Sequence, residues 1–167
     1  MARERYAGLS FEQVVQKYAP NVYRACYVRL QGTADVDDCV QNSFVKLYRK
    51  APDFKDEDHL KAWLLRVAIN ECKKSVRDRG RFISLDHVEE SSFPSSDHAH
   101  ADDLRDASWA LMRLTPKYRE VLYLYYIERY KVDEIAAILG VKSGTVKSLL
   151  HRGRIKLREI YGGDMHE

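Results

Sequence analysis

The side chains best suited to chemistry lie close together near the C-terminal end of the sequence. They are hydroxyl, imidazole and basic groups: Thr145, Lys147, Ser148, His151, Arg152 and Arg154. Val146 and Leu150 recur among them at helical spacing, so a helix here buries one face and leaves these groups on the others. Arginine and lysine on an exposed helix face can hydrogen-bond guanine or neutralise phosphates. The segment therefore predicts contact with nucleic acid.

The residues around this segment favour a helix-turn-helix that would position it. Residues 133–139 form a short helix with Ile135, Ala136 and Leu139 facing inward, and Gly140 takes the positive φ that ends it. Ser143 is expected to cap the second helix. Such units place their second helix in the major groove. An ordinary helical hairpin with a solvated basic face is the alternative.

The N-terminal half is predicted to contain three further amphipathic helices and no strand. They cover roughly residues 11–30, 35–50 and 58–79, with Pro20 expected to kink or restart the first. Trp63 has the spacing of a core residue rather than of a stacking wedge. In the second half, Thr115 is expected to cap a helix that has Pro116 at its first position.

Charge divides the chain into three blocks. Residues 1–80 carry a net charge of +4, residues 81–103 of −5 and residues 104–167 of +4, which together give the overall +3. The acidic block is rich in Ser, Asp and His and contains Pro94, a composition typical of linkers. We therefore predict an all-α fold: two small helical domains, residues 1–80 and 104–167, joined by an acidic flexible linker at 81–103.

Several other functions find no support in the sequence. It has no phosphate-cradling glycine loop, His-Glu-x-x-His or nucleophile motif, so no catalytic residue is assigned and no enzymatic activity is expected. The 3 cysteines are isolated and are expected to be small buried hydrophobes. His98 and His100 are expected to be polar filler, and neither a metal nor a cofactor is predicted. Without a signal peptide or an apolar span, the expected location is cytoplasmic.

Two sets of motifs, in order, resemble bacterial RNA polymerase sigma factors of the extracytoplasmic-function group. The first set is DVDDCVQ at 35–41 and AWLLRVAIN at 62–70, and the second is LTPKYREVL at 114–122, DEIA at 133–136 and GTVKS at 144–148. The resemblance runs from about Phe11 to Arg158. It implies promoter-specific transcription initiation, with core RNA polymerase and promoter DNA as partners and no small-molecule substrate.

Carried over residue by residue, the resemblance assigns three binding surfaces. Asp35, Asp37, Asp38 and Gln41 would dock on the β′ clamp helices of the polymerase. Phe54, Lys55, Arg66, Asn70, Lys73, Lys74 and Arg77 would melt and read the minus-ten element, with Asn70 and the loop 53–58 holding a flipped base. Thr145, Lys147, Ser148, His151, Arg152 and Arg154 would face the minus-thirty-five element. The second domain would also meet the β flap, and an anti-sigma factor, often membrane-bound in the family, is an expected partner.

Some details of these assignments depend on local physics. Asp35 is expected to act mainly as a helix N-cap, and the neighbouring acids could merely complement the helix dipole, which leaves Asp38 and Gln41 as the better binding residues. Asn42 stands where the family usually has Glu, Lys74 where many members have Asp, and Leu149 where most have Arg. Leu149 removes one possible DNA contact, and Gly153, which replaces the usual Ala, is expected to weaken its helix by about 1 kcal/mol. Isolated DNA binding by this domain should therefore be weak, and its promoter preference distinct.

Two other classes of protein are compatible with part of the sequence. A free-standing helix-turn-helix regulator that binds operators as a homodimer would explain the second domain, with residues 1–80 as a sensor. It would leave the motifs of the first domain unexplained. An enzyme with an appended DNA-binding domain would need a cluster of polar catalytic residues within residues 1–80, and none is found there.

Overall fold

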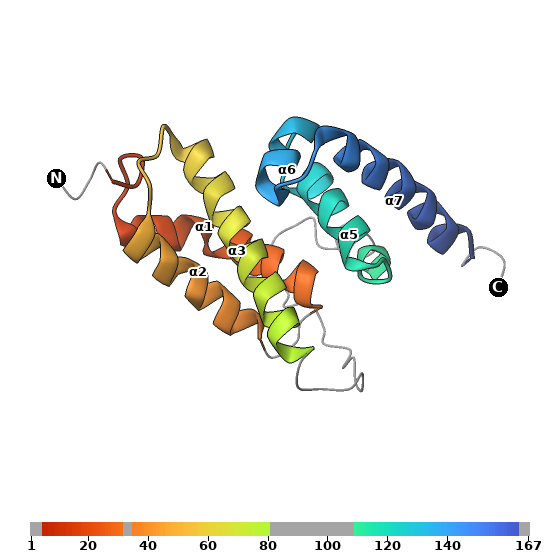
Figure 1. Cartoon of the computed structure of the whole chain (residues 1–167), viewed down its shortest axis with the longest axis horizontal. Helices are drawn as coiled ribbons and strands as arrows, with labels where there is room; N and C mark the ends of the chain where they lie inside the picture. Colours follow the sequence, from red (N-terminus) through yellow and green to blue (C-terminus); the bar gives the residue numbers. More distant parts are fainter. Residues whose placement is uncertain (1–4, 32–34, 81–108, 164–167) are drawn as a thin grey trace, which may run out of the picture. The chain divides into compact units, whose positions relative to one another are not determined.

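The computed structural model describes residues 5–31, 35–80 and 109–163. This part of the chain is helical apart from its turns and one isolated bridge between Tyr6 and Leu9. The chain divides into two compact units, residues 1–91 and 92–167, each of which is described by itself (Figure 1). The all-α fold in two helical domains is thus confirmed. The predicted linker at 81–103 lies outside the described residues, so its boundaries stay a prediction.

The first unit is a bundle of three helices, α1 (Phe11–Leu30), α2 (Val36–Lys50) and α3 (Glu57–Arg79). A capping box starts α1: the Ser10 hydroxyl accepts from the Gln13 amide at 3.1 Å, and the Gln13 side chain accepts from the Ser10 amide at 2.9 Å. The helix then runs unbroken through Pro20, so the restart expected at that residue does not occur. Each helix contacts the other two.

The core of this unit is built from the stripes that the periodicity predicted. Its fully buried side chains come from all three helices and include Val14, Val22, Cys26, Leu47, Leu60, Leu64 and Cys72. Trp63 is half-buried and packs against this core, as its spacing indicated. The cysteines are free thiols and are all buried, which agrees with their expected role as small hydrophobes.

The second unit contains α5 (Pro116–Leu122), the π-helical segment η1 (Tyr123–Ile127), α6 (Val132–Leu139) and α7 (Ser143–Gly163). Pro116 takes the first position of α5 as predicted. Thr115 occupies the cap position, but its side chain makes no capping bond, so that part of the expectation is wrong. Instead, the buried Arg119 guanidinium donates from Nη1 to the carbonyls of Met112 and Leu114, each at 3.4 Å. This contact holds the preceding turn against α5.

One π-helical turn extends α5, and a buried hydrogen bond between two polar side chains closes it. The Glu128 amide donates to the Tyr123 carbonyl at 3.2 Å, five residues back, which is the pattern of a π-helix. The Tyr123 hydroxyl donates to Glu128 Oε1 at 2.6 Å within the protein interior. The wider turn sets the positions of Tyr125 and Tyr126 on the outside of η1.

The helix-turn-helix predicted from the sequence is present as α6 and α7. Gly140 has φ +67° and ends α6, and the two helices contact each other while burying Ile135, Ala136, Val146 and Leu150. Leu139, expected to face inward, is only half-buried, because Ile138 takes the buried position instead.

The start of α7 differs from the expectation for Ser143. The Val146 amide donates to the Lys142 carbonyl at 3.2 Å, which makes Ser143 the first residue of the helix rather than its cap. The Ser143 hydroxyl donates to Asp133 Oδ1 at 2.6 Å. This bond links the first turn of α7 to the first turn of α6.

Candidate functional site

The acidic face of α2 is exposed and carries the residues assigned to polymerase docking. Val36, Cys39, Ser43, Phe44 and Leu47 turn inward, which leaves Asp37, Asp38 and Gln41 on the surface. The Ser43 hydroxyl donates to the Cys39 carbonyl at 2.7 Å, so this buried polar group is satisfied within the helix. The structure therefore brings three of the four predicted residues together on one accessible surface.

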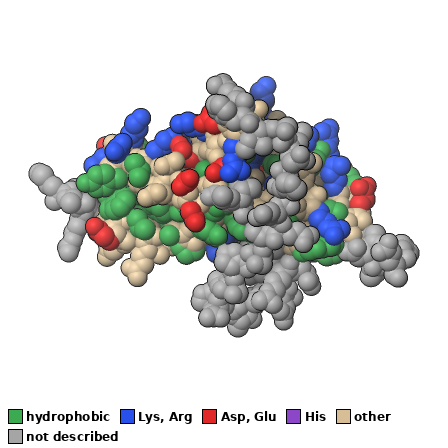
Figure 2. Space-filling model, turned by 90° about the horizontal axis from the view of Figure 1, so that it is seen from below, with side chains coloured by type: hydrophobic (Ala, Val, Ile, Leu, Met, Phe, Trp, Pro, Cys, Tyr) green, Lys and Arg blue, Asp and Glu red, His purple; other side chains and the backbone are tan. Residues whose placement is uncertain are grey.

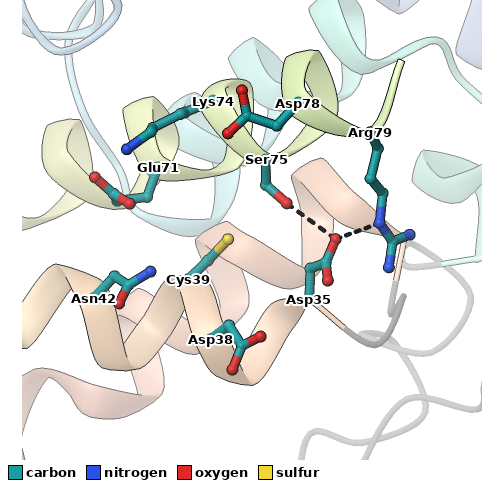
Figure 3. Close-up of a pocket in the computed structure, with 9 residues that line it drawn as sticks. All are labelled: Asp35, Asp38, Cys39, Asn42, Glu71, Lys74, Ser75, Asp78 and Arg79. Carbon is teal, nitrogen blue, oxygen red and sulfur yellow. Dashed lines mark hydrogen bonds and ion pairs between the residues drawn. The ribbon is translucent and has the colours of Figure 1, made fainter. Parts of the chain in front are cut away.

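The fourth residue, Asp35, has a different partner from the one expected. It stands at the N-cap position of α2, but its carboxylate makes no capping bond. Its Oδ2 accepts instead from the Ser75 hydroxyl at 3.0 Å and lies 2.6 Å from Nε of Arg79, both on α3 (Figure 3). The expected N-cap is wrong because two donors on the neighbouring helix outcompete the local amides. Asp35 thus joins the start of α2 to the end of α3.

A pocket of about 410 Å³ opens beside this contact, between α2 and α3. Four of its nine lining residues are carboxylates. Asp35, Asp38, Cys39 and Asn42 line it from the side of α2, and Glu71, Lys74, Ser75, Asp78 and Arg79 line it from α3 (Figure 3). Glu71 is buried and forms an ion pair with Lys46. Burial and the neighbouring Cys72 thiol raise the pKa of Cys39 to about 12, so its thiol stays protonated at neutral pH.

The cationic residues predicted to meet the minus-ten element share one face of α3. Arg66, Asn70, Lys74 and Arg77 are exposed and recur at intervals of four, four and three residues, which places them in one row along the helix. Lys73, on the edge of this row, is half-buried. A row of positive charge that includes an asparagine suits a strand with phosphates on one side and bases on the other.

The loop before α3 is fixed by several contacts rather than being an open segment. The Asp56 carboxylate caps α3 by accepting from the His59 amide at 2.8 Å, and the Lys55 amide donates to Nδ1 of His59 at 3.2 Å. Phe54 is half-buried and sets its ring edge-on to His59 and Trp63, with centroids 5.4 and 5.6 Å away. Lys55 remains exposed. A pre-formed loop of this kind loses little entropy when it binds a base.

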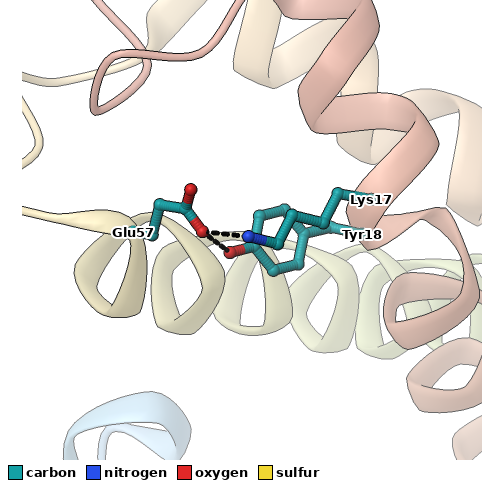
Figure 4. A network of polar contacts seen from close by, with 3 residues as sticks. All are labelled: Lys17, Tyr18 and Glu57. Atoms are coloured by element: carbon teal, nitrogen blue, oxygen red, sulfur yellow. Dashed lines mark hydrogen bonds and ion pairs between the residues drawn. The ribbon is translucent and has the colours of Figure 1, made fainter.

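A polar network anchors the first residue of α3 to α1. The Tyr18 hydroxyl donates to Glu57 Oε2 at 2.7 Å, and the Lys17 ammonium pairs with the same oxygen (Figure 4). Burial, followed by the hydrogen bond to Glu57, raises the pKa of Tyr18 well above its usual range. The Lys17 ammonium and the Tyr18 hydroxyl lower the pKa of Glu57. Sequence reasoning missed this network because its members lie about forty residues apart.

The residues expected to face the minus-thirty-five element are presented by α7. Thr145, Lys147, Ser148, His151 and Arg152 are all exposed, opposite the buried Val146 and Leu150.

Arg154 is the exception in this set, because it is half-buried against η1. Its Nε donates to the Tyr126 hydroxyl at 2.7 Å, and the guanidinium carbon lies 5.4 and 5.7 Å from the ring centroids of Tyr125 and Tyr126. Two adjacent tyrosines were the only signal for this contact in the sequence.

Gly153 allows α7 to approach α5 closely. A Cβ atom at this position would lie 3.1 Å from Cδ1 of Leu122 and 3.5 Å from Cβ of Tyr118. The residue therefore has a packing role that the expectation of a weakened helix did not include.

Beyond these surfaces, the described residues offer little for metal or membrane chemistry. Among them, no three His, Cys, Asp or Glu side chains gather so as to hold a metal ion. None of their helices is long and apolar enough to span a membrane. His98 and His100 lie outside the described residues.

Basic, acidic and hydrophobic side chains all reach the face of the molecule drawn in Figure 2.

Comparison with known families accounts for both units in order. Residues 14–82 match the model of sigma-70 region 2, and residues 109–157 match the model of sigma-70 region 4. The RNA polymerase sigma-E factor of Streptomyces avermitilis is 32% identical over 154 residues, which cover 90% of this chain and 84% of that protein. The chain belongs to the extracytoplasmic-function sigma factors.

Other relatives of this sigma factor come from Mycolicibacterium and Bacillus. The ECF RNA polymerase sigma factor SigE of Mycolicibacterium smegmatis is 34% identical over 159 residues, which span 90% of this chain but only 61% of that protein. SigW of Bacillus subtilis is 27% identical over 164 residues, covering 90% of this chain and 88% of SigW. The sequence resemblance noted above is thereby confirmed.

Two solved structures share the fold of this sigma factor. The sigma factor RpoE of Bartonella quintana, in complex with the anti-sigma factor NepR, aligns with a TM-score of 0.70 and 28% identity over 91% of this chain and 96% of RpoE. CnrH, in complex with the cytosolic domain of CnrY, aligns with a TM-score of 0.66 and 28% identity over 98% of this chain and 96% of CnrH.

Proposed function

We propose that this sigma factor divides promoter recognition between its two units. The exposed face of α2, with Asp38 and Gln41 at its centre, docks on the β′ clamp helices of core RNA polymerase. Acidic and amide groups at helical spacing suit an arginine-bearing coiled coil. The second unit meets the β flap. The polymerase carries out nucleotidyl transfer, and the sigma factor supplies no catalytic group.

In this proposal α3 and the loop before it open and read the minus-ten element. Arg66, Lys74 and Arg77 neutralise phosphates of the non-template strand, while Asn70 and the loop hold one base outside the stack. The pocket contacts offset the cost of unstacking, which favours the open duplex. Support comes from the single row that these side chains form on α3 and from the fixed conformation of the loop.

The recognition helix α7 reads the minus-thirty-five element in the major groove. Lys147, Ser148, His151 and Arg152 are exposed on its outer side, where arginine and lysine can hydrogen-bond guanine or phosphate. The observation that carries the whole proposal is the ordered match to regions 2 and 4, each with its cationic helix face exposed.

An anti-sigma factor is the second partner we propose. RpoE, which shares this fold, was solved with the anti-sigma factor NepR. A regulator of this kind would cover the polymerase-binding and promoter-binding faces.

The test is run-off transcription with bacterial core RNA polymerase on a library of genomic fragments. We expect discrete start sites that require both components, and aligned starts would then give both promoter elements. A palindromic footprint formed by the protein without polymerase, together with no added transcription, would replace the proposal with a free-standing helix-turn-helix regulator that binds operators as a homodimer.

A further inference from the structure

Arg154 and the tyrosines of η1 form a polar cluster on one flank of the recognition helix. The Nε–H of Arg154 donates to the hydroxyl of Tyr126, and both tyrosine rings lie against the guanidinium, with the rings themselves edge-to-face at 4.9 Å. One hydrogen bond and the contacts with two rings restrict the conformations of the side chain. The contacts therefore pre-organise a long side chain that would otherwise adopt many conformations.

The cluster keeps unused hydrogen-bonding capacity. In the part of the chain that the structure describes, Nε is the one donor of Arg154 that has a partner, so the N–H groups on Nη1 and Nη2 stay available. The Tyr126 hydroxyl accepts from Arg154 and retains its own proton to donate, and Tyr126 is 53% exposed. These N–H groups and the hydroxyl proton, next to one positive charge, suit the oxygens of a phosphate.

The cluster also continues a line of cations along α7. Lys147, His151, Arg154 and Arg158 follow one another at intervals of four, three and four residues, so they lie on one flank of the helix, about 4.5–6 Å apart along its axis. No carboxylate occupies a position in this line. The line borders the outer face that Ser148 and Arg152 present, so a duplex held on that face brings a phosphate backbone alongside it.

We infer that Arg154 and the Tyr126 hydroxyl together bind a backbone phosphate of promoter DNA beside the minus-thirty-five element, with Tyr125 and Tyr126 as positioning residues. This inference rests on the proposed promoter binding. Arg154 accordingly fixes the register of α7 in the groove and does not read a base.

The two ligands of this site have different signatures in salt. Each phosphate neutralised by a cation adds about 0.9 to the slope of log affinity against log salt concentration. A neutral hydroxyl adds hydrogen-bond energy without releasing a counterion. We therefore expect Arg154→Gln to reduce the slope by about 0.9. We expect Tyr126→Phe to weaken binding about fivefold and to leave the slope unchanged.

The experiment uses the holoenzyme, assembled from core polymerase and the full chain, and a duplex that carries the minus-thirty-five element and ends before the minus-ten element. Affinity is measured over a series of KCl concentrations. Arg154→Lys should keep the slope and lose affinity, since lysine cannot bridge the Tyr126 hydroxyl and a phosphate with a planar fork. Lys156→Gln is the matched control. Lys156 also lies over a tyrosine ring, with Nζ 5.6 Å from the Tyr118 centroid, but it is on the other flank of α7. The salt slope of the Lys156→Gln variant should therefore equal that of the wild type.

Two results would overturn the inference. If Arg154→Gln kept the wild-type slope while Lys147→Gln lowered it, the duplex would be bound without a phosphate at Arg154, and the proposed function would survive. If Arg154→Gln and Tyr126→Phe both lowered the melting temperature without changing the slope, the cluster would only brace η1 against α7. A wild-type holoenzyme that failed to bind the duplex would remove the proposed function itself, and this inference with it.

Discussion

Replacing Gly153 by alanine tests whether its neighbours at the α5–α7 contact can yield. The added Cβ would lie 3.1 Å from Cδ1 of Leu122, closer than carbon atoms ordinarily approach, and 3.4 Å from its Cγ. Leu122 is 1% exposed, so it is surrounded by other core atoms and has little room to withdraw. Alanine at this position therefore gains helix propensity and loses packing at the same time.

The two effects are similar in size, and we expect the packing loss to exceed the gain. Alanine is better than glycine in a helix interior by about 1 kcal/mol, whereas overpacking a core costs about 1–3 kcal/mol. The net change should be a destabilisation of about 1 kcal/mol. In a unit of this size such a loss lowers the melting temperature by about 4–8 °C.

Thermal unfolding of three variants measures this balance. Gly162→Ala is the control, because a Cβ there would meet nothing within 4 Å; it should leave the melting temperature unchanged or raise it. In a Leu122→Ala background the space next to residue 153 is open, and adding Gly153→Ala should then increase folding stability by about 1 kcal/mol. If Gly153→Ala alone raised the melting temperature as much as in that background, the contact would be soft and the close-packing argument would be refuted.

Three further predictions concern the surfaces described above. Glu57→Gln should cost at most about 1 kcal/mol of folding stability, because the pairing is partly exposed. The difference in stability from the wild type should be fully present above the unfolded pKa of Glu, about 4.3, and should vanish as the pH falls through the lowered pKa of folded Glu57. Chemical unfolding measured over a range of pH values would show this dependence. Asp38→Arg should weaken core polymerase binding at least tenfold in a pull-down titration with the fold intact, whereas the same reversal at the exposed α1 residue, Glu12→Arg, should not. Arg152→Ala should lower transcription from intact promoters by about tenfold and have little effect once the minus-thirty-five element is scrambled; equal losses on both templates would contradict its assignment.

Local sequence rules sufficed for the helices and for the turn between α6 and α7. The 3.6-residue periodicity identifies which face of α2 and α7 is buried, and Gly140 marks the end of α6, since each signal depends only on neighbours within a few residues. The same rules place Asp38, Gln41 and Arg152 on exposed faces, where the structure has them. What those surfaces bind remains a prediction.

The caps were less predictable because their partners come from other helices. Asp35 and Ser143 both carry side chains that favour N-caps, yet Asp35 binds Ser75 and Arg79, and Ser143 binds Asp133. The side chain of a cap residue can hydrogen-bond either to the local amide or to a group that the tertiary fold brings near. Only the local amide can be inferred from the sequence.

Lys74 illustrates how one side chain can serve two neighbouring surfaces, and its removal separates them. It lies in the row of cations on α3 and also lines the pocket with Asp38 and Asp78. Lys74→Gln should reduce the salt slope for binding a non-template minus-ten strand to holoenzyme by about 0.7, the value for one single-strand phosphate contact. Core affinity should change less than twofold, because Asp38 is exposed and its charge is already screened by solvent. If the slope stayed constant while core affinity rose or fell severalfold, Lys74 would act by setting the charge of the pocket, and the polymerase-binding surface would extend from α2 across to α3.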